Sequence, residues 1–277
     1  MGRARFGHLS RDRRDRGGDP RRPADVQGAA GPELTEARTR LLALGFSEAD
    51  AVTLADHFLD AERRGKQGHG LARIAWLETL PDLDPAARPR LEAEYAGFEQ
   101  WDGAGALGYL TLAAICDRVA DEPPWPSKVV VARNTFPTGA VGYWVRRIAE
   151  EADRVAILTA TSPPRLAHPD GGPPLVGTTP LAIGIPNPGG DPIVVDVSMG
   201  KVTHGDVLAG LVGPEELVPF GGEQSYKAFA LALGLQLAVE ACVAEGYGAL
   251  LVVIAPETST VPELRERAAG LRLPGDR

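Results

Sequence analysis

The chain has 277 residues, of which 44% are hydrophobic and 24% charged, so it can bury a sizeable core and differs from intrinsically disordered chains. A net charge of −8 argues against a general nucleic-acid binder, and two cysteines exclude a disulfide scaffold and multi-cysteine zinc modules. The longest strongly apolar run, residues 249–255, is much shorter than the roughly 20 residues of a membrane helix. We therefore expect a cytoplasmic globular protein with no metal site, nucleic-acid partner or membrane partner.

Residues 1–30 differ in composition from the rest of the chain. They carry eight arginines and four aspartates but almost no large apolar side chains. Such a segment cannot bury enough surface to offset the entropy of ordering it, so we expect a disordered arm. It has no apolar stretch of the kind that a secretory signal needs.

Two helices are predicted in the first third of the chain. Ser47, with Asp50 three residues later, resembles a capping box, and Gly65 is a plausible stop for the helix that follows. A second helix is predicted over about 69–80, because its apolar residues recur at helical spacing.

Strand and helix patterns alternate in the second half. Apolar runs predict strands at 128–133, 154–160, 193–197 and 249–255, and helices at 139–152 and about 224–246. A strand, helix and strand in succession favour an α/β sheet with parallel pairs.

A literal G-x-G-x-x-G occurs at Gly103, Gly105 and Gly108. In a dinucleotide-binding fold this motif follows a buried strand, but the preceding residues 98–102 (FEQWD) make a poor buried strand. A glycine-rich turn before a helix at about 110–120 is the better interpretation.

The segment GHGLAR contains His69 and Arg73, four residues apart. On a helix the two side chains would share one face, and the helix N-terminus would keep the imidazole neutral near pH 7. A neutral histidine can exchange a proton with a substrate hydroxyl while the guanidinium holds a carboxylate by two hydrogen bonds. The alternative is an ordinary surface pair.

Three further residues are candidates for a site. Thr179 lies in a polar elbow before an apolar strand, with an ordinary turn as the alternative. Asp196 ends a predicted strand, where ligands bind in α/β sheets, or else caps the following loop. Lys227, one of four lysines in the chain, lies in the first turn of a helix, where the helix dipole disfavours a cation unless a phosphate or carboxylate is bound. A solvated lysine is the alternative there.

Taken in order, these segments resemble the type-2 malate/L-lactate dehydrogenase family, with its sulfolactate and ureidoglycolate dehydrogenases and Δ1-piperideine-2-carboxylate reductases. GHGLAR (68–73) is similar to the family's "SHGxxR", and GTTP (177–180) to its "GTNP". VVDVS (194–198) is similar to "lDmAtS", and PFGGEQSYKAFALAL (219–233) to "PlGGxxGyKGxgLAl". The resemblance spans about 34–277.

The resemblance implies a mixed-sheet α/β fold that is not of the Rossmann type, a nicotinamide cofactor (NAD or NADP) and a homodimer. It implies one domain over 31–277, with a helical part at about 34–120 and a nucleotide-binding part at about 121–255. By similarity, the residues on the cofactor would be Thr161, Val195, Asp196, Val197 and Lys227, and those facing the substrate would be His69, Arg73 and Thr179.

The chain also departs from the family pattern. The family's catalytic histidine lies in a segment like "rnSxHfG", which is RNTFPTGA here, with Pro137 at the histidine position. Gly68 replaces the serine of "SHG", and Thr179 replaces the asparagine of "GTNP". The stretches after residue 201 and after the long helix are shorter than the family usually has.

The sequence therefore predicts an oxidoreductase that moves hydride to or from C2 of a small 2-oxo, 2-hydroxy or cyclic 2-imino acid. Arg73 would bind the carboxylate and His69 would transfer a proton. Proline has no proton to give, so the sequence predicts slow reduction of 2-oxo acids and a bias towards imines, whose protonated form accepts hydride directly. The alternatives are a catalytically degenerate relative that binds a ligand or partner, and an enzyme repurposed for lyase or cyclisation chemistry.

Overall fold

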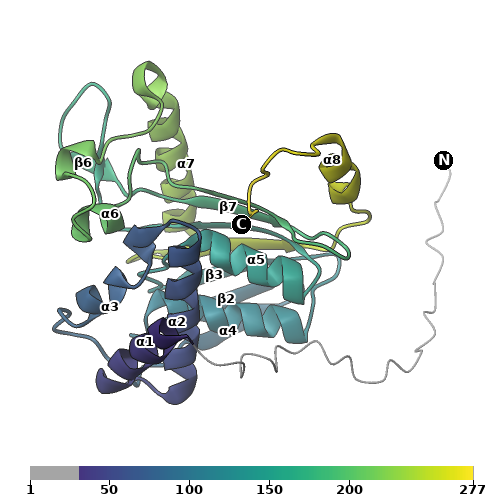
Figure 1. The fold of residues 1–277 in the computed structure, drawn as a ribbon, viewed down its shortest axis with the longest axis horizontal. Coiled ribbons are helices and arrows are strands. Elements are labelled where there is room, and N and C mark those ends of the chain that lie inside the picture. Colours follow the sequence, from purple (N-terminus) through teal and green to yellow (C-terminus); the bar gives the residue numbers. More distant parts are fainter. Residues whose placement is uncertain (1–30, 277) are drawn as a thin grey trace.

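A seven-stranded mixed sheet organises residues 31–276, the part of the chain that a computed structural model describes (Figure 1). The arm expected at 1–30 lies outside the described residues. In order across the sheet, the strands are β1 (Arg90–Tyr95), β2 (Phe98–Asp102), β3 (Ser127–Arg133), β9 (Ala249–Ile254), β4 (Val155–Ala160), β7 (Leu181–Ile185) and β8 (Ile193–Val197). The four strands predicted from apolar runs are confirmed as β3, β4, β8 and β9.

The strand directions bring three strand ends to one edge of the sheet. Within residues 31–276, β2 and β3 are the one parallel pair of neighbours in this sheet. Antiparallel β9 separates β3 from β4, and antiparallel β7 separates β4 from β8, so β3, β4 and β8 all run in the same direction. The expected strand, helix and strand are present, but the two strands are not neighbours because β9 lies between them. The carboxyl ends of β3, β4 and β8 meet at one edge.

Helices cover both faces of the sheet (Figure 1). The helices α1 (Pro32–Ala43), α2 (Glu48–Arg63), α4 (Gly108–Asp121) and α5 (Val141–Glu151) lie on one side, and α7 (Ser225–Val243) lies on the other. Successive side chains of β3 point to opposite faces of the sheet. Val130 and Ala132 join the main core, whereas Val131 packs with Val239 and Val243 of α7 on the other face.

Short elements complete the described chain. They are η1 (Gln67–His69), α3 (Ala72–Leu77), a hairpin of β5 (Leu166–Ala167) and β6 (Pro174–Val176), α6 (His204–Leu208), η2 (Pro214–Glu216), η3 (Gly222–Gln224) and α8 (Val261–Arg267). Of these, η1, α3 and α6 lie beside the site described below.

The two helices predicted in the first third have different outcomes. Ser47 caps α2 as expected, because its Oγ accepts a hydrogen bond from the Asp50 N–H at 3.2 Å, and Gly65 follows the end of α2 with φ +71°. The helix predicted over 69–80 is wrong in extent. Gly70 is extended (φ −89°, ψ −148°), and the Leu71 N–H donates to Glu62 of α2 instead of continuing a helix.

The glycine motif forms a turn before α4, as predicted, but the residues before it were misjudged. FEQWD is the strand β2, with three of its five residues buried. The glycines permit close packing, since a Cβ at Gly108 would lie 2.6 Å from the Pro137 carbonyl oxygen and one at Gly103 would collide with the Asn134 carbonyl. The motif therefore packs against the 134–137 loop.

The helix α7 is more apolar than the sequence survey recognised. An 18-residue window within Gly222–Val243 has a mean hydropathy of 1.4, so the helix is long and apolar enough, by length and composition, to cross a membrane. One face packs on the sheet, whereas Tyr226, Leu231, Leu233 and Leu237 are exposed. Core helices pass the same test of length and composition, so the finding alone does not indicate a membrane.

Candidate active site

A cavity of about 620 Å³ opens at the edge where β3, β4 and β8 end. Its walls come from η1 and α3, from the loops that follow these three strands, and from α6. The lining includes Lys66, His69, Arg73, Trp76, Pro137, Thr138, Thr161, Arg165, Thr178, Asp196, Val197, Lys201, His204 and Asp206. Its volume is in the usual range for a small-molecule site.

Arg73 is a buried cation without an anion. The residue is 9% exposed, its Nε has no hydrogen-bond partner, and no carboxylate of residues 31–276 forms an ion pair with its guanidinium. The guanidinium carbon lies 5.0 Å from the centre of the Trp76 ring. Burying an unpaired charge is costly, which makes this guanidinium a candidate partner for an anionic ligand.

His69 faces the same cavity although it shares no helix with Arg73. It ends η1, whereas Arg73 belongs to α3, and the turn at Gly70 brings both side chains to one wall. Burial, followed by the nearby cations Arg73 and Lys66, lowers the pKa of His69 to about 3. The neutral imidazole predicted from sequence is retained, but burial causes it and a helix N-terminus does not.

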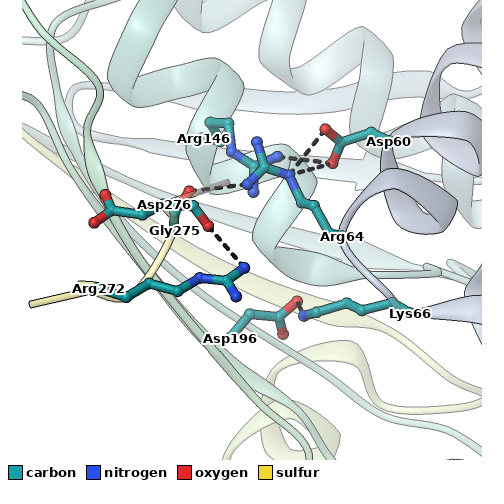
Figure 2. A network of polar contacts seen from close by, with 8 residues as sticks. All are labelled: Asp60, Arg64, Lys66, Arg146, Asp196, Arg272, Gly275 and Asp276. Carbon is teal, nitrogen blue, oxygen red and sulfur yellow. Dashed lines mark hydrogen bonds and ion pairs between the residues drawn. The ribbon is translucent and has the colours of Figure 1, made fainter.

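Lys66 and Asp196 form an ion pair on the cavity wall (Figure 2). Asp196 comes from β8 and Lys66 from the residue before η1. Gly142 of α5 packs under the carboxylate, where a Cβ would lie 2.7 Å from Asp196 Oδ2. Lys66 was not among the residues expected from the sequence to form the site.

Polar contacts tie the segment before Lys66 to the end of the described chain (Figure 2). Arg64 Nε donates to Asp60 Oδ1 at 2.9 Å, and Arg64 Nη1 donates to the Gly275 carbonyl oxygen at 2.9 Å. Arg146 Nη1 of α5 donates to the other Asp60 oxygen at 2.8 Å. Only Gly65 lies between Arg64 and Lys66, so this network holds the backbone from which Lys66 extends.

The other predicted cofactor residues divide into two groups. Thr161 and Val197 line the cavity, and the Thr161 hydroxyl accepts a hydrogen bond from the Gly248 N–H at 2.9 Å. Val195 is not part of the lining. Lys227 is exposed on α7, where its Nζ donates to Gln224 Oε1 at 2.7 Å, and it lies outside this cavity.

Thr179, predicted to face the substrate, is fully buried behind the cavity wall. Its hydroxyl donates to the Gly177 carbonyl oxygen at 3.3 Å, and Gln236 Oε1 lies 3.5 Å away. Its neighbours Thr178 and Pro180 line the cavity instead. The segment is therefore at the site, but its side chains alternate so that Thr179 points into the protein.

Two further cationic or polar side chains, Arg165 and His204, also line the cavity. The buried Arg165 Nε and the buried His204 Nδ1 have no hydrogen-bond partner among the described residues. Burial, then the charges of Arg165 and Arg73, lower the pKa of His204. No local motif marks either residue; the fold brings them to the cavity with Arg73.

The departures from the family pattern also lie at this site. Pro137 lines the cavity, so the position implied for the catalytic histidine carries no titratable group here. Gly68 packs directly on the start of α6, where a Cβ would lie 2.5 Å from the Asp206 N and 2.7 Å from the Gly205 carbonyl carbon. A serine at this position would displace α6.

A buried histidine behind the cavity makes folding stability depend on pH. His57 is fully buried, its Nε2 accepts a hydrogen bond from the Ala140 N–H at 3.2 Å, and burial, followed by His69, lowers its pKa from 6.5 to about 3. Because the unfolded chain binds this proton first, the stability is fully present above pH 6.5 and is lost as pH falls towards 3. His57 alone should cost about 2 kcal/mol between pH 7 and pH 5.

Urea denaturation of the wild type and of His57→Phe at both pH values measures this loss. The variant should be less stable at pH 7, since the Ala140 N–H loses its acceptor, but should lose about 2 kcal/mol less on acidification than the wild type. Equal losses in both proteins would contradict the assignment.

Known dehydrogenases and reductases are similar to this chain in sequence. A family described as malate/L-lactate dehydrogenase matches residues 33–211. A Δ1-pyrroline-2-carboxylate/Δ1-piperideine-2-carboxylate reductase of Pseudomonas syringae pv. tomato is 27% identical over 309 positions, which cover 91% of this chain and 89% of that protein. A (2R)-3-sulfolactate dehydrogenase (NADP(+)) of Chromohalobacter salexigens is 32% identical over 182 positions, 63% of this chain and 54% of that protein.

Solved structures have the same fold. A Δ1-piperideine-2-carboxylate reductase from Pseudomonas syringae pv. tomato superposes with a TM-score of 0.74 at 23% identity, covering 88% of this chain and 89% of that one. Sulfolactate dehydrogenase from Methanocaldococcus jannaschii superposes with a TM-score of 0.70 at 21% identity, covering 87% and 82%. The mixed-sheet α/β fold expected from the resemblance, distinct from the Rossmann fold, is confirmed. With the family match spanning well over half of its residues, this chain belongs to the malate/L-lactate dehydrogenase family.

Proposed function

We propose that the protein is an NAD(P)-dependent oxidoreductase that transfers hydride to or from C2 of a small 2-oxo or 2-hydroxy acid, or of a cyclic 2-imino acid. The observation that carries this proposal is Arg73, a buried guanidinium with no anionic partner in the described chain, facing a cavity of about 620 Å³. A planar guanidinium binds a carboxylate through two parallel hydrogen bonds.

The named relatives support a C2 acid as the substrate class. One is a reductase of cyclic imino acids and another a dehydrogenase of a sulfonated hydroxy acid that uses NADP(+). Each substrate carries a carboxylate beside the carbon that gains or loses hydride. The same chemistry in this chain would use Arg73 for that carboxylate.

The residues of the cavity suit a nicotinamide nucleotide as well as the acid. Arg165, whose buried Nε lacks a partner, offers a guanidinium for a phosphate. We assign the walls at Thr161, Asp196 and Val197 to cofactor contact, with no preference between NAD and NADP. The bound nucleotide would supply or accept the hydride. Lys227 enters this proposal only through a second copy of the chain, because it lies outside this cavity.

Each substrate-side residue then has a definite task. Arg73 holds the carboxylate and fixes the position of C2. His69, neutral because of its low pKa, can donate one N–H hydrogen bond to the substituent on C2. A protonated cyclic imine needs nothing more than orientation and exclusion of water, since its nitrogen already carries the proton.

A homodimer is part of the proposal. The exposed face of α7 carries Tyr226, Leu231, Leu233 and Leu237. Contiguous exposed apolar surface on a helix marks an interaction site, and we assign it to a second copy. Sedimentation at equilibrium should give about twice the chain mass of 29.2 kDa. A cytoplasmic location stays a prediction from composition.

Titration with NADH and NADPH, followed by nicotinamide fluorescence, tests the proposed function. We expect saturable binding of at least one nucleotide, and its oxidation when a 2-oxo acid or a cyclic 2-imino acid is added. Failure to bind either nucleotide would contradict the proposal and would favour a degenerate ligand-binding protein or a non-redox enzyme that uses the same cavity.

A further inference from the structure

Reduction of a 2-oxo acid at this cavity lacks an evident proton source. Hydride addition at C2 leaves a negative charge on the oxygen, which must gain a proton. Pro137 has none to give. His69, expected from the sequence to transfer the proton, has a pKa of about 3 and is neutral at pH 7, so it can accept a proton from a hydroxyl but is a very weak acid in the reductive direction. Another group on the cavity wall must therefore supply the proton.

Lys66 has the required chemistry and position. Its side chain is 36% exposed and lines the cavity that also contains Arg73 and His69. An ammonium carries three N–H donors, and the carboxylate of Asp196 engages one side of it. The remaining donors are available to a ligand, and the partial exposure lets water return a proton after transfer.

The surrounding structure holds Lys66 in place. Its backbone N–H donates to the Ala61 carbonyl oxygen at 2.8 Å, which fixes the chain after α2. Asp196 is itself confined, with a side chain 13% exposed and with Gly142 packed beneath it. Figure 2 shows the pair beside the Arg64 network that joins α2 to Gly275. Lys66 is therefore a positioned group.

The choice of lysine over arginine is informative. The chain has only four lysines among its 29 basic residues, and arginine forms most of its described ion pairs. Arginine would hold Asp196 at least as well and with better geometry, but arginine does not release a proton in proteins. Unlike an arginine at the same position, Lys66 can both hold Asp196 and release a proton to a ligand in the cavity.

We propose that Lys66, positioned by Asp196, is the catalytic proton donor to the C2 oxygen of a 2-oxo acid; this rests on the proposed function. Hydride forms the new C2–H bond, and the electron pair of the C=O π bond moves to oxygen. A proton from Lys66 Nζ forms the O–H bond, which leaves a neutral amine that water reprotonates. In the reverse direction the amine accepts the hydroxyl proton.

Lys66 variants and two substrates test this assignment. With a 2-oxo acid, Lys66→Ala should lower kcat by about 10²–10⁴-fold, the usual contribution of a general acid, with a smaller change in KM. Lys66→Arg keeps the charge beside Asp196 but should not restore kcat, whereas added ethylamine should restore part of the activity of Lys66→Ala. A protonated cyclic 2-imino acid should lose only a few-fold in kcat.

A second measurement does not depend on turnover. Reductive methylation with ¹³C-formaldehyde labels the lysines, and the signal missing from Lys66→Arg identifies Lys66. Oxamate, a stable 2-oxo acid analogue, should shift this signal and leave in place that of Lys128, which is paired with Glu99 outside the cavity. An unmoved Lys66 signal with bound oxamate would overturn the proposal.

The outcomes separate this inference from the proposed function. Wild-type kcat in Lys66→Ala with the 2-oxo acid would overturn the role of Lys66. Equal loss with both substrates and no rescue by amine would overturn it too. If the wild type reduces the imino acid but not the 2-oxo acid, the role of Lys66 as proton donor is overturned, while the proposed function remains intact. A wild type that binds neither nucleotide contradicts the proposed function itself.

Discussion

Replacing Arg73 with alanine is expected to weaken binding of a 2-oxo acid analogue such as oxamate by about 2–5 kcal/mol, the usual loss when one partner of a buried charge pair is removed. This corresponds to a roughly 30- to 4,000-fold increase in Kd. The reason is that no acceptor of the described chain meets the Arg73 guanidinium, so the ligand carboxylate supplies its anionic partner. Isothermal titration calorimetry measures the change directly.

The same variant should keep or gain folding stability, which distinguishes a binding role from a structural one. An unpaired buried charge destabilises the folded protein, and its removal relieves that cost, apart from the contact with Trp76. Arg73→Lys should not restore binding, because a point charge does not reproduce the planar fork. Arg88→Ala, at a half-exposed arginine paired with Asp50, is the matched control. Unchanged oxamate affinity in Arg73→Ala would exclude this residue from the site.

The parts of the fold that sequence reasoning found are those with local apolar patterns. The strands β3, β4, β8 and β9 are continuous apolar runs, and α5 and α7 carry helical patterns long enough to recognise. The strand β1 was missed because five of its six residues are exposed, which leaves no apolar alternation to read. The strand β2 was missed because a glutamate occupies its second position, which is buried.

The sequence located single candidates for the site, such as the closely spaced His69 and Arg73 and the strand-end Asp196, but did not show which distant segments meet. His69 and Arg73 were found from their spacing, although an extended glycine and not a common helix brings them to one wall. Lys66 was overlooked because its partner Asp196 is 130 residues away, and only the sheet topology shows that they meet. Thr179 shows a second limit of the sequence. The motif locates the segment at the site, but it does not show that Thr178, and not the adjacent Thr179, faces the cavity.

Glu99, the residue that concealed β2, is where the largest loss of stability is expected. Its side chain is fully buried, and it accepts hydrogen bonds from Arg118 Nε at 2.8 Å, from Trp101 Nε1 at 3.0 Å and from Lys128. Burial opposes its ionisation, but these donors outweigh burial and leave the pKa of Glu99 below its ordinary value. Glu99→Ala leaves the largely buried Lys128 ammonium without its partner, which should lower the free energy of unfolding by about 3–5 kcal/mol.

The neighbouring Glu94 provides a matched control for this prediction. It also pairs with Arg118, at 2.6 Å, but its side chain is 48% exposed, so Glu94→Ala should cost at most about 1 kcal/mol. Urea denaturation at pH 7 compares the two variants. Because a lowered carboxyl pKa stabilises the fold above the unfolded value of about 4.5, the deficit of Glu99→Ala should shrink as pH falls below that value. Equal costs for the two alanine variants would contradict the prediction, because they would show that the shared Arg118, and not the burial of Glu99, is the source of the effect.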